Sequence, residues 1–319
     1  MKKKQIGGLV LAVGLFILTG VASVFSNIKA DRIAEEVLNV GQSLPKNKYI
    51  AVINVIGTIE GQDSDSVFED TQSYRHLDTL EFIDSITNDN NNAGIMLFLD
   101  TPGGSVYESD ELYLKLMDYK ESTGRPVWSY MSHMAASGGY YAAMSSDVIY
   151  ANRNAITGSI GVIMSGVDMT GLYEKLGIKY YSATSGEYKD SSVMTDDQLN
   201  ILQTMVDETY EQFVDVVETG RGMTEDQVKN LADGRIYTAN QALENGLIDE
   251  IGSLEDVQKK MLEETGAYEY YVLESPENVF SSFFAKIKNI MPKSEAQVLD
   301  EIKDEQTSGR LMYYAEQLQ

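Results

Sequence analysis

Apolar and polar positions along residues 49–271 alternate between a strand-like and a helix-like spacing. Continuous apolar runs occupy residues 49–59 and 93–100, which is typical of strands buried on both faces of a parallel sheet. Residues 77–86 and 107–122 instead carry apolar side chains three or four positions apart, which predicts helices. Strands that alternate with helices predict an α/β domain with a mostly parallel sheet.

The same alternation continues in the middle of the chain. Residues 125–131 and 148–152 have the composition of strands, and the small residues at 135–146 predict a short helix. Residues 158–164 predict a turn that leads into a further strand.

Residues 195–217 form the clearest predicted helix. Thr195 and Gln198 have the spacing of a capping box, and Thr224 and Thr238 begin two further capped segments. The helix is expected to bury one apolar face, made of Leu199, Leu202, Val206, Tyr210, Phe213 and Val217.

The N-terminus carries the longest uncharged run. Residues 6–25 are apolar and long enough to span a bilayer as a helix, and lysines precede them. We therefore expect a cytoplasmic N-terminus at residues 1–5, a transmembrane anchor at 6–25 and a stalk at 26–48, with the rest outside the cytoplasm. A cleaved signal peptide is the alternative, since Gly20 and Ala22 fit a small-x-small cleavage rule, but the run exceeds the usual ~7–15 apolar residues.

The amino-acid composition excludes several classes of catalytic group and binding partner. The chain has no cysteine and 2 histidines, which excludes thiolate catalysis and disulfides and argues against a multi-histidine metal centre. We expect neither a metal nor a cofactor. The formal net charge of −24 disfavours nucleic acid as a partner.

Two glycine-rich segments are the candidates for chemistry. In "MAASGGYYAAM", Ser137 precedes two glycines and a helix-like run, and in "DTPGGSV" a buried strand runs into Gly104. Glycine lets the backbone approach a ligand closely, and backbone N–H groups can stabilise an oxyanion. Each segment also fits an ordinary tight turn, so neither segment alone establishes a catalytic site.

A serine nucleophile needs a base. His133 stands four residues before Ser137, on the same strand exit, and no aspartate is evidently placed to orient it, so we disfavour it. Lys189, in "TSGEYKDSS", is the alternative, because a buried lysine is neutral more readily than an exposed one. A solvated surface lysine is the competing interpretation.

The motifs occur together and in order. "TPGG…VYES", "MAASGGYYAAM", "TGSIGVIM", "SGEYKD" and "GRIYTANQA…GLIDEIG" resemble the signal peptide peptidase A family of membrane-anchored bacterial Ser/Lys proteases, in its short single-repeat form. The resemblance covers most of residues 49–252, the N-terminal anchor and the "GRLMYYA" ending.

The resemblance implies a ClpP/crotonase-like α/β superhelix of repeated strand-strand-helix units. It makes Ser137 the nucleophile and Lys189 the general base. Gly104 and Gly138 match the main-chain oxyanion donors, and Ser159 matches the serine that hydrogen-bonds the lysine.

The resemblance also implies a function. It points to a serine endopeptidase that degrades signal peptide remnants, works without a cofactor and assembles into a homo-octameric ring in which neighbouring chains complete the sites. Its location would be the cell membrane, with a single span and an extracytoplasmic peptidase domain at residues 49–271.

Two other functions remain open. One is a membrane-anchored ring scaffold of the same fold without catalysis, and the other is an acyl-CoA enzyme on the crotonase fold. Residues 272–319 form a C-terminal segment whose apolar-aromatic end, residues 310–319, resembles a tethered peptide substrate. It could dock in a binding groove as a self-inhibitor, be trimmed, or serve as a packing segment.

Overall fold

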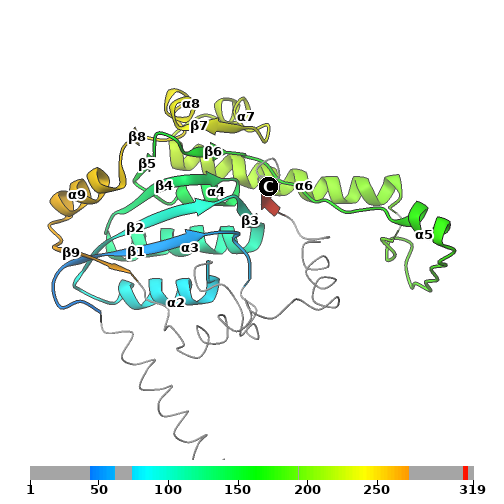
Figure 1. The fold of residues 1–319 in the computed structure, drawn as a ribbon, viewed down its shortest axis with the longest axis horizontal. Coiled ribbons are helices and arrows are strands. Elements are labelled where there is room, and N and C mark those ends of the chain that lie inside the picture. The colour runs from blue at the N-terminus through cyan, green and yellow to red at the C-terminus, as the bar shows by residue number, and fades with distance from the viewer. Residues whose placement is uncertain (1–43, 62–73, 193, 273–311, 315–319) are drawn as a thin grey trace, which may run out of the picture. The chain divides into compact units, whose positions relative to one another are not determined.

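Strands β1 (Tyr49–Ile56), β2 (Asn92–Thr101) and β4 (Val127–Ala136) form the parallel centre of an eight-stranded sheet in the computed structural model (Figure 1). The sheet order is β7-β6-β4-β2-β1-β9, and β5 joins β4 to β8. The outer strands are β5 (Val148–Ala151), β6 (Ile156–Gly158), β7 (Ile236–Thr238), β8 (Glu250–Ile251) and β9 (Glu269–Val272). The structure describes residues 44–61, 74–192, 194–272 and 312–314.

The predicted α/β class with a mostly parallel sheet is confirmed. Every described pair in the eight-stranded sheet is parallel except β6 with β7 at one edge. Successive residues of β1 are buried on both faces, with Ile50 and Ala51 both at 0 % exposure. A strand covered on both sides has no polar face, which is why its sequence is a continuous apolar run.

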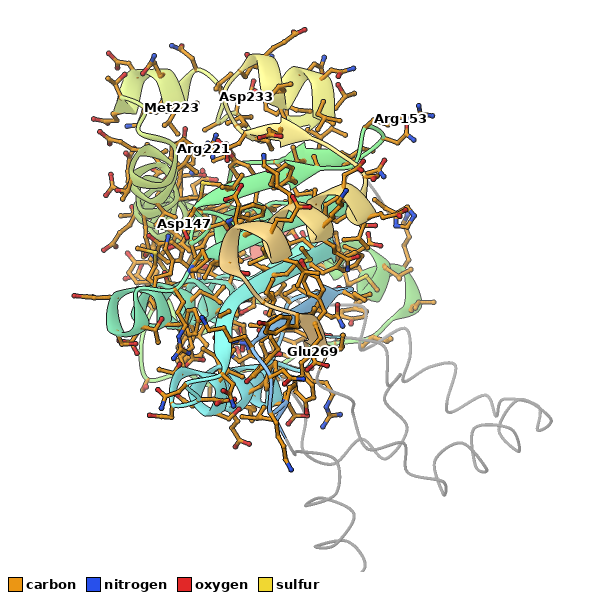
Figure 2. All side chains as sticks on the ribbon, turned by 90° about the vertical axis from the view of Figure 1, so that its left-hand side faces the viewer. Asp147, Arg153, Arg221, Met223, Asp233 and Glu269 are labelled. Atoms are coloured by element: carbon orange, nitrogen blue, oxygen red, sulfur yellow. The ribbon has the colours of Figure 1, made fainter. Side chains whose placement is uncertain are left out.

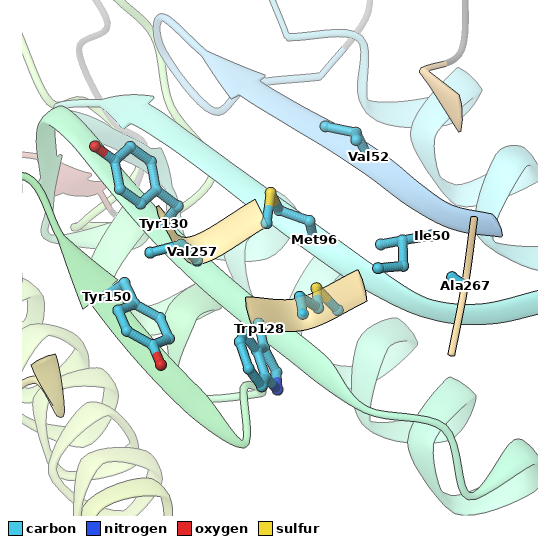
Figure 3. Packing of buried hydrophobic residues seen from close by; sticks show 9 residues of the cluster. Ile50, Val52, Met96, Trp128, Tyr130, Tyr150, Val257 and Ala267 are labelled. Carbon is cyan, nitrogen blue, oxygen red and sulfur yellow. The ribbon is translucent and has the colours of Figure 1, made fainter. Parts of the chain in front are cut away.

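Helices cover the two faces of the sheet. Helices α2 (His76–Thr87), α3 (Val106–Thr123) and α4 (Gly138–Ala143) pack side by side on one face, and α9 (Leu254–Thr265) packs on the other. Figure 3 shows the core under α9, where the aromatic rings of the central strands meet its apolar residues. This cluster includes Ile50, Met96, Trp128, Tyr130, Tyr150, Val257 and Met261.

Helix α6 (Asp196–Arg221) is anchored at its C-terminal end. Arg221, labelled in Figure 2, forms an ion pair with Asp249, with 2.7 Å between Nη2 and Oδ1. From there α6 extends away from the sheet, and α5 (Thr170–Leu176) lies beyond its other end (Figure 1). The predicted capping boxes at α6, α7 (Glu225–Lys229) and α8 (Ala239–Glu244) are all formed.

Two local predictions are wrong. The helix predicted at 135–146 begins only at Gly138, because Ala135 and Ala136 still pair with β6 as part of β4. The turn predicted from Gly158 is present, with positive φ angles at Gly158 and Ser159, but it ends β6, and among the described residues no named strand follows before α5 (Thr170–Leu176). At Ala135 and Ala136 the pairing with a distant strand outweighs the local preference for helix.

The predicted buried face of α6 is buried only in part. Phe213 and Val217 are fully buried, but Leu199 is 50 % exposed and Leu202 and Val206 are intermediate. The N-terminal half of this helix therefore presents apolar side chains that nothing in the described part of the chain covers.

The described residues between Pro45 and Val272 belong to one compact unit. The predicted cytoplasmic segment, the anchor, most of the stalk and most of residues 272–319 lie outside the described residues. Among the helices that are described, none has the length and hydropathy needed to cross a bilayer.

Candidate active site

Ser137 occupies a strained turn between β4 and α4. Its φ of 53° is rare for a residue other than glycine, and such a conformation costs roughly 1–3 kcal/mol. Two backbone hydrogen bonds hold it: Ser137 N–H donates to the Gly158 carbonyl at 2.8 Å, and Tyr141 N–H donates to the Ser137 carbonyl at 2.9 Å. A serine on a tight strand-to-helix turn is the geometry in which nucleophilic hydroxyls are presented.

The hydroxyl of Ser137 has no hydrogen-bond partner among the described residues. The residue is fully buried, and its Oγ is the buried side-chain atom that forms no hydrogen bond within the described residues. An unsatisfied buried hydroxyl costs about 1–3 kcal/mol, so its persistence calls for an explanation. The base that would accept its proton is absent from the described surroundings of Ser137 in a single chain.

Gly104 lies at the centre of the short strand β3 (Gly103–Ser105). Ile59 N–H donates to the Gly103 carbonyl at 2.9 Å, and Ser105 N–H donates to the Ile59 carbonyl at 2.7 Å. Because backbone polar groups alternate in direction along a strand, the N–H of Gly104 itself faces away from Ile59. A Cβ on Gly104 would collide with the Ile59 carbonyl, so glycine is required there.

Gly138 brings a second glycine backbone beside that of Gly104. A Cβ placed on Gly138 would lie 3.2 Å from the Gly104 nitrogen, so the two glycine backbones are immediate neighbours. Gly138 directly follows Ser137, and α4 contacts β3. Two amides beside a serine hydroxyl form the arrangement needed to stabilise a tetrahedral oxyanion.

Ser159 joins the same region through the sheet. Ala136 pairs with Gly158 in the β4–β6 ladder, which places Ser159 close to the turn that carries Ser137. Ser159 has a φ of 51°, and it lines a cavity of about 400 Å³ together with residues of α6 and of the segment before β7. Thus Ser137, Gly104, Gly138 and Ser159 converge at the carboxyl end of the sheet, as expected.

Lys189 is not brought to this place within the chain. Its side chain is exposed, and it lies in the connection between α5 and α6. Figure 1 shows that the N-terminal end of α6 points away from the sheet and that α5 lies beyond it. A pocket closed to water around Lys189 therefore does not exist in the described part of a single chain.

The segment that carries Lys189 exposes many apolar side chains. We call residues 164–192 and 194–206 the arm. Its exposed apolar side chains are Val167, Leu172, Tyr173, Leu176, Ile178, Tyr180, Tyr181, Tyr188, Met194, Leu199, Ile201 and Met205, each at least 41 % exposed. A contiguous run of this kind marks an interaction surface.

His133 is engaged elsewhere. Its Nδ1 lies 2.6 Å from Asp100 Oδ2, and 87 % of its side chain is exposed. The hydrogen bond to Asp100, and then the charge of that carboxylate, raise the pKa of His133. Asp100 cannot be recognised as its partner from the sequence, because the β2–β4 register shifts between Leu99 and Thr101, which brings Asp100 opposite a bulge in the neighbouring strand.

The described end of the C-terminal segment lies directly at this site. Strand β10 (Met312–Tyr314) pairs antiparallel with β3, and Tyr313 lies opposite Gly104. Strand β10 therefore runs along the side of β3 to which the Gly104 N–H faces.

Comparisons with known proteins identify relatives. Residues 119–267 match the sequence profile of peptidase family S49. A putative signal peptide peptidase of Enterococcus faecium is 38 % identical over 261 residues, which cover 81 % of this chain and 74 % of that protein. A putative protease of Synechocystis is 41 % identical over 52 % of this chain and 60 % of its own length. A chloroplastic serine protease of Arabidopsis thaliana is 31 % identical over 55 % of this chain and 26 % of its own length.

Proposed function

Because the chain belongs to peptidase family S49, a family of serine proteases, and is similar to signal peptide peptidase A, we propose that it degrades the remnants of cleaved signal peptides. The described α/β sheet fits the ClpP/crotonase-like superhelix that we propose for the whole domain. The observation that carries the assignment is the strained, buried Ser137, whose unpaired hydroxyl lies beside the Gly104 and Gly138 backbones.

The proposed reaction is acyl transfer in two steps. A neutral Lys189 amine takes the proton of the Ser137 hydroxyl, and Oγ attacks the carbonyl carbon of the scissile peptide bond. The N–H groups of Gly104 and Gly138 stabilise the oxyanion, and Lys189 returns the proton to the leaving amine. Water then attacks the acyl-enzyme with Lys189 again as base, which releases the acid product and restores Ser137.

We place Lys189 of one copy next to Ser137 of its neighbour. The exposed Lys189, the apolar arm and the uncovered half of α6 support this, because burying the arm against another copy would cover all three. The cavity lined by Ser159 is a space that could receive the lysine, and Ser159 would orient its amine. The contact joins two different surfaces, and repeating it generates a ring where the rotation between neighbours closes. We propose that it closes as an octamer.

The proposed location follows from the sequence. Residues 6–25 would anchor the ring in the cell membrane, with residues 49–271 outside the cytoplasm. Signal peptide remnants are apolar and lie in the bilayer, so a tethered peptidase would meet them at the membrane surface.

An extended peptide can bind this site by adding a strand to β3. The antiparallel β10 supports this mode of binding, since its backbone already follows the strand that carries Gly104. Main-chain hydrogen bonds would supply most of the affinity, and side-chain pockets would supply the selectivity.

We expect the full chain in detergent to cleave a synthetic peptide with an apolar signal-peptide core faster than a peptide of equal length in which alternate apolar residues are serine. Each lost apolar contact of one side chain weakens binding by roughly 1–3 kcal/mol, so the ratio of kcat/KM should exceed tenfold. Mass spectrometry of the products measures both rates. Equal rates on the two peptides would contradict the proposed substrates but not the peptidase, whereas no cleavage of either would favour the scaffold.

Deletion of residues 310–319 is expected to raise the initial rate of peptide hydrolysis. The strand β10 occupies the side of β3 where the substrate would lie, so its removal frees the site, mainly by lowering the apparent KM. The matched control truncates only residues 315–319 and leaves β10 in place. An unchanged KM after the longer deletion, together with an intact C-terminus in both the parent and a Ser137→Ala chain, would favour a packing role for the tail.

A further inference from the structure

Ser109 lies where the two glycine segments meet. It belongs to the first turn of α3, it is fully buried, and no part of the proposed reaction uses it. Helix α3 follows β3 directly and packs against α4, so Ser109 faces the segments that carry Gly104 and Gly138.

The hydroxyl of Ser109 is tied to the residue that follows Gly104. Its Oγ donates to the Ser105 carbonyl at 2.7 Å. Ser105 N–H in turn donates to the Ile59 carbonyl at 2.7 Å, and Ile59 N–H donates to the Gly103 carbonyl at 2.9 Å, so backbone bonds hold β3 on both sides of Gly104. The hydroxyl of Ser109 is therefore connected, through Ser105, to the strand that carries Gly104.

The same side chain limits the position of Gly138. A Cβ built on Gly138 would overlap Ser109 Oγ and lie 3.2 Å from Ser109 Cβ. The serine side chain thus fills the space against the Gly138 backbone. A larger residue would push α4 away, and a smaller one would leave a gap.

We propose that Ser109 is a positioning residue that sets the distance between the Gly104 and Gly138 amides. It touches the Gly138 backbone and is hydrogen-bonded to the residue after Gly104, and among the described residues it forms no hydrogen bond with the Ser137 hydroxyl. Stabilisation of an oxyanion depends on the placement of its donors, so loss of this spacer weakens transition-state binding more than substrate binding. The inference rests on the proposed function, because the two amides matter only if an oxyanion forms between them.

The test compares Ser109→Ala and Ser109→Gly with matched controls on the same helix. Ser122 also donates its hydroxyl to a backbone carbonyl one turn back, Tyr119, at 3.3 Å, but it is exposed near the far end of α3. Ser122→Ala and Ser122→Gly therefore reproduce the change in helix propensity away from the site. The measurements are kcat and KM for peptide hydrolysis, and the inhibition constants of a peptide boronate and of the matching product acid.

We expect Ser109→Ala to lower kcat about tenfold and Ser109→Gly to lower it further, with KM within about twofold of the parent. Boronate affinity should fall by the same factor as kcat/KM, since the boronate adduct imitates the tetrahedral intermediate, while affinity for the product acid stays unchanged. The Ser122 variants should match the parent in all four quantities.

Equal kcat and boronate affinity in the Ser109 variants and the Ser122 controls would overturn the role of Ser109. So would a parallel loss of boronate and product-acid affinity, which would indicate general damage to the site. A parent chain that hydrolyses no peptide would overturn the proposed function itself, and the role of Ser109 with it.

Discussion

Replacing Ser137 with alanine is expected to abolish peptide hydrolysis while leaving the fold intact. The loss in kcat should be at least about 10³-fold, because without the hydroxyl no acyl-enzyme can form. The fold should survive because Ser137 Oγ forms no hydrogen bond with the described residues, so alanine breaks no such contact. Removal of an unsatisfied buried hydroxyl should leave the free energy of unfolding equal or slightly higher.

The control is Ser145→Ala, a second buried serine close to α4. Ser145 Oγ donates to the Ala142 carbonyl at 2.8 Å, so this change should cost about 1 kcal/mol of stability and preserve activity. Peptide hydrolysis, labelling by a fluorophosphonate and denaturant unfolding separate the two variants. Hydrolysis that persists in Ser137→Ala would remove the proposed nucleophile, and a folded parent that neither cleaves nor labels would favour the scaffold.

The second large effect is expected at Lys189. Lys189→Ala should lower kcat by about the same factor as Ser137→Ala, because the two groups act as one unit. Two controls distinguish the base from other cations of the chain. Lys175→Ala changes another lysine of the arm, and His133→Ala removes the imidazole that is held by Asp100. Both should keep most of the activity.

Mixing the two inactive chains tests whether the site is shared. If Lys189 acts on the Ser137 of a neighbour, co-expression of Ser137→Ala and Lys189→Ala chains in equal amounts restores about a quarter of the sites, since each subunit pairs at random with its neighbour. If both residues act within one chain, the mixture stays inactive. Full activity of Lys189→Ala alone would remove the proposed base and most of the mechanism.

Much of the fold could be predicted from local pattern. The buried strands, the long capped helix and the α/β class follow from apolar spacing and from Thr-x-x-Gln motifs that satisfy the first backbone amides of each helix. A predicted element is wrong where pairing between strands, and not local preference, sets the secondary structure. Ala135 and Ala136 have no strong strand preference of their own, and they extend β4 because β6 lies beside them.

The candidate site also has some features that can be predicted from the sequence and others that cannot. Its residue types follow from the sequence alone: a serine before two glycines, a Pro-Gly-Gly turn after a buried strand, a lysine in a polar loop, and too few histidines or cysteines for other common catalytic groups. These depend on composition and on near neighbours, so they can be read without a fold.

The spatial arrangement of these residues depends on the folded chain. The strained φ of Ser137, its unpaired hydroxyl, the contact of the Gly138 and Gly104 backbones and the spacing role of Ser109 all depend on segments brought together by the sheet. The exposed Lys189 and the uncovered apolar arm depend on where α6 leaves the sheet. Contacts between residues far apart in the sequence produce these features. A local sequence pattern does not specify which distant segments come into contact, so it cannot predict them.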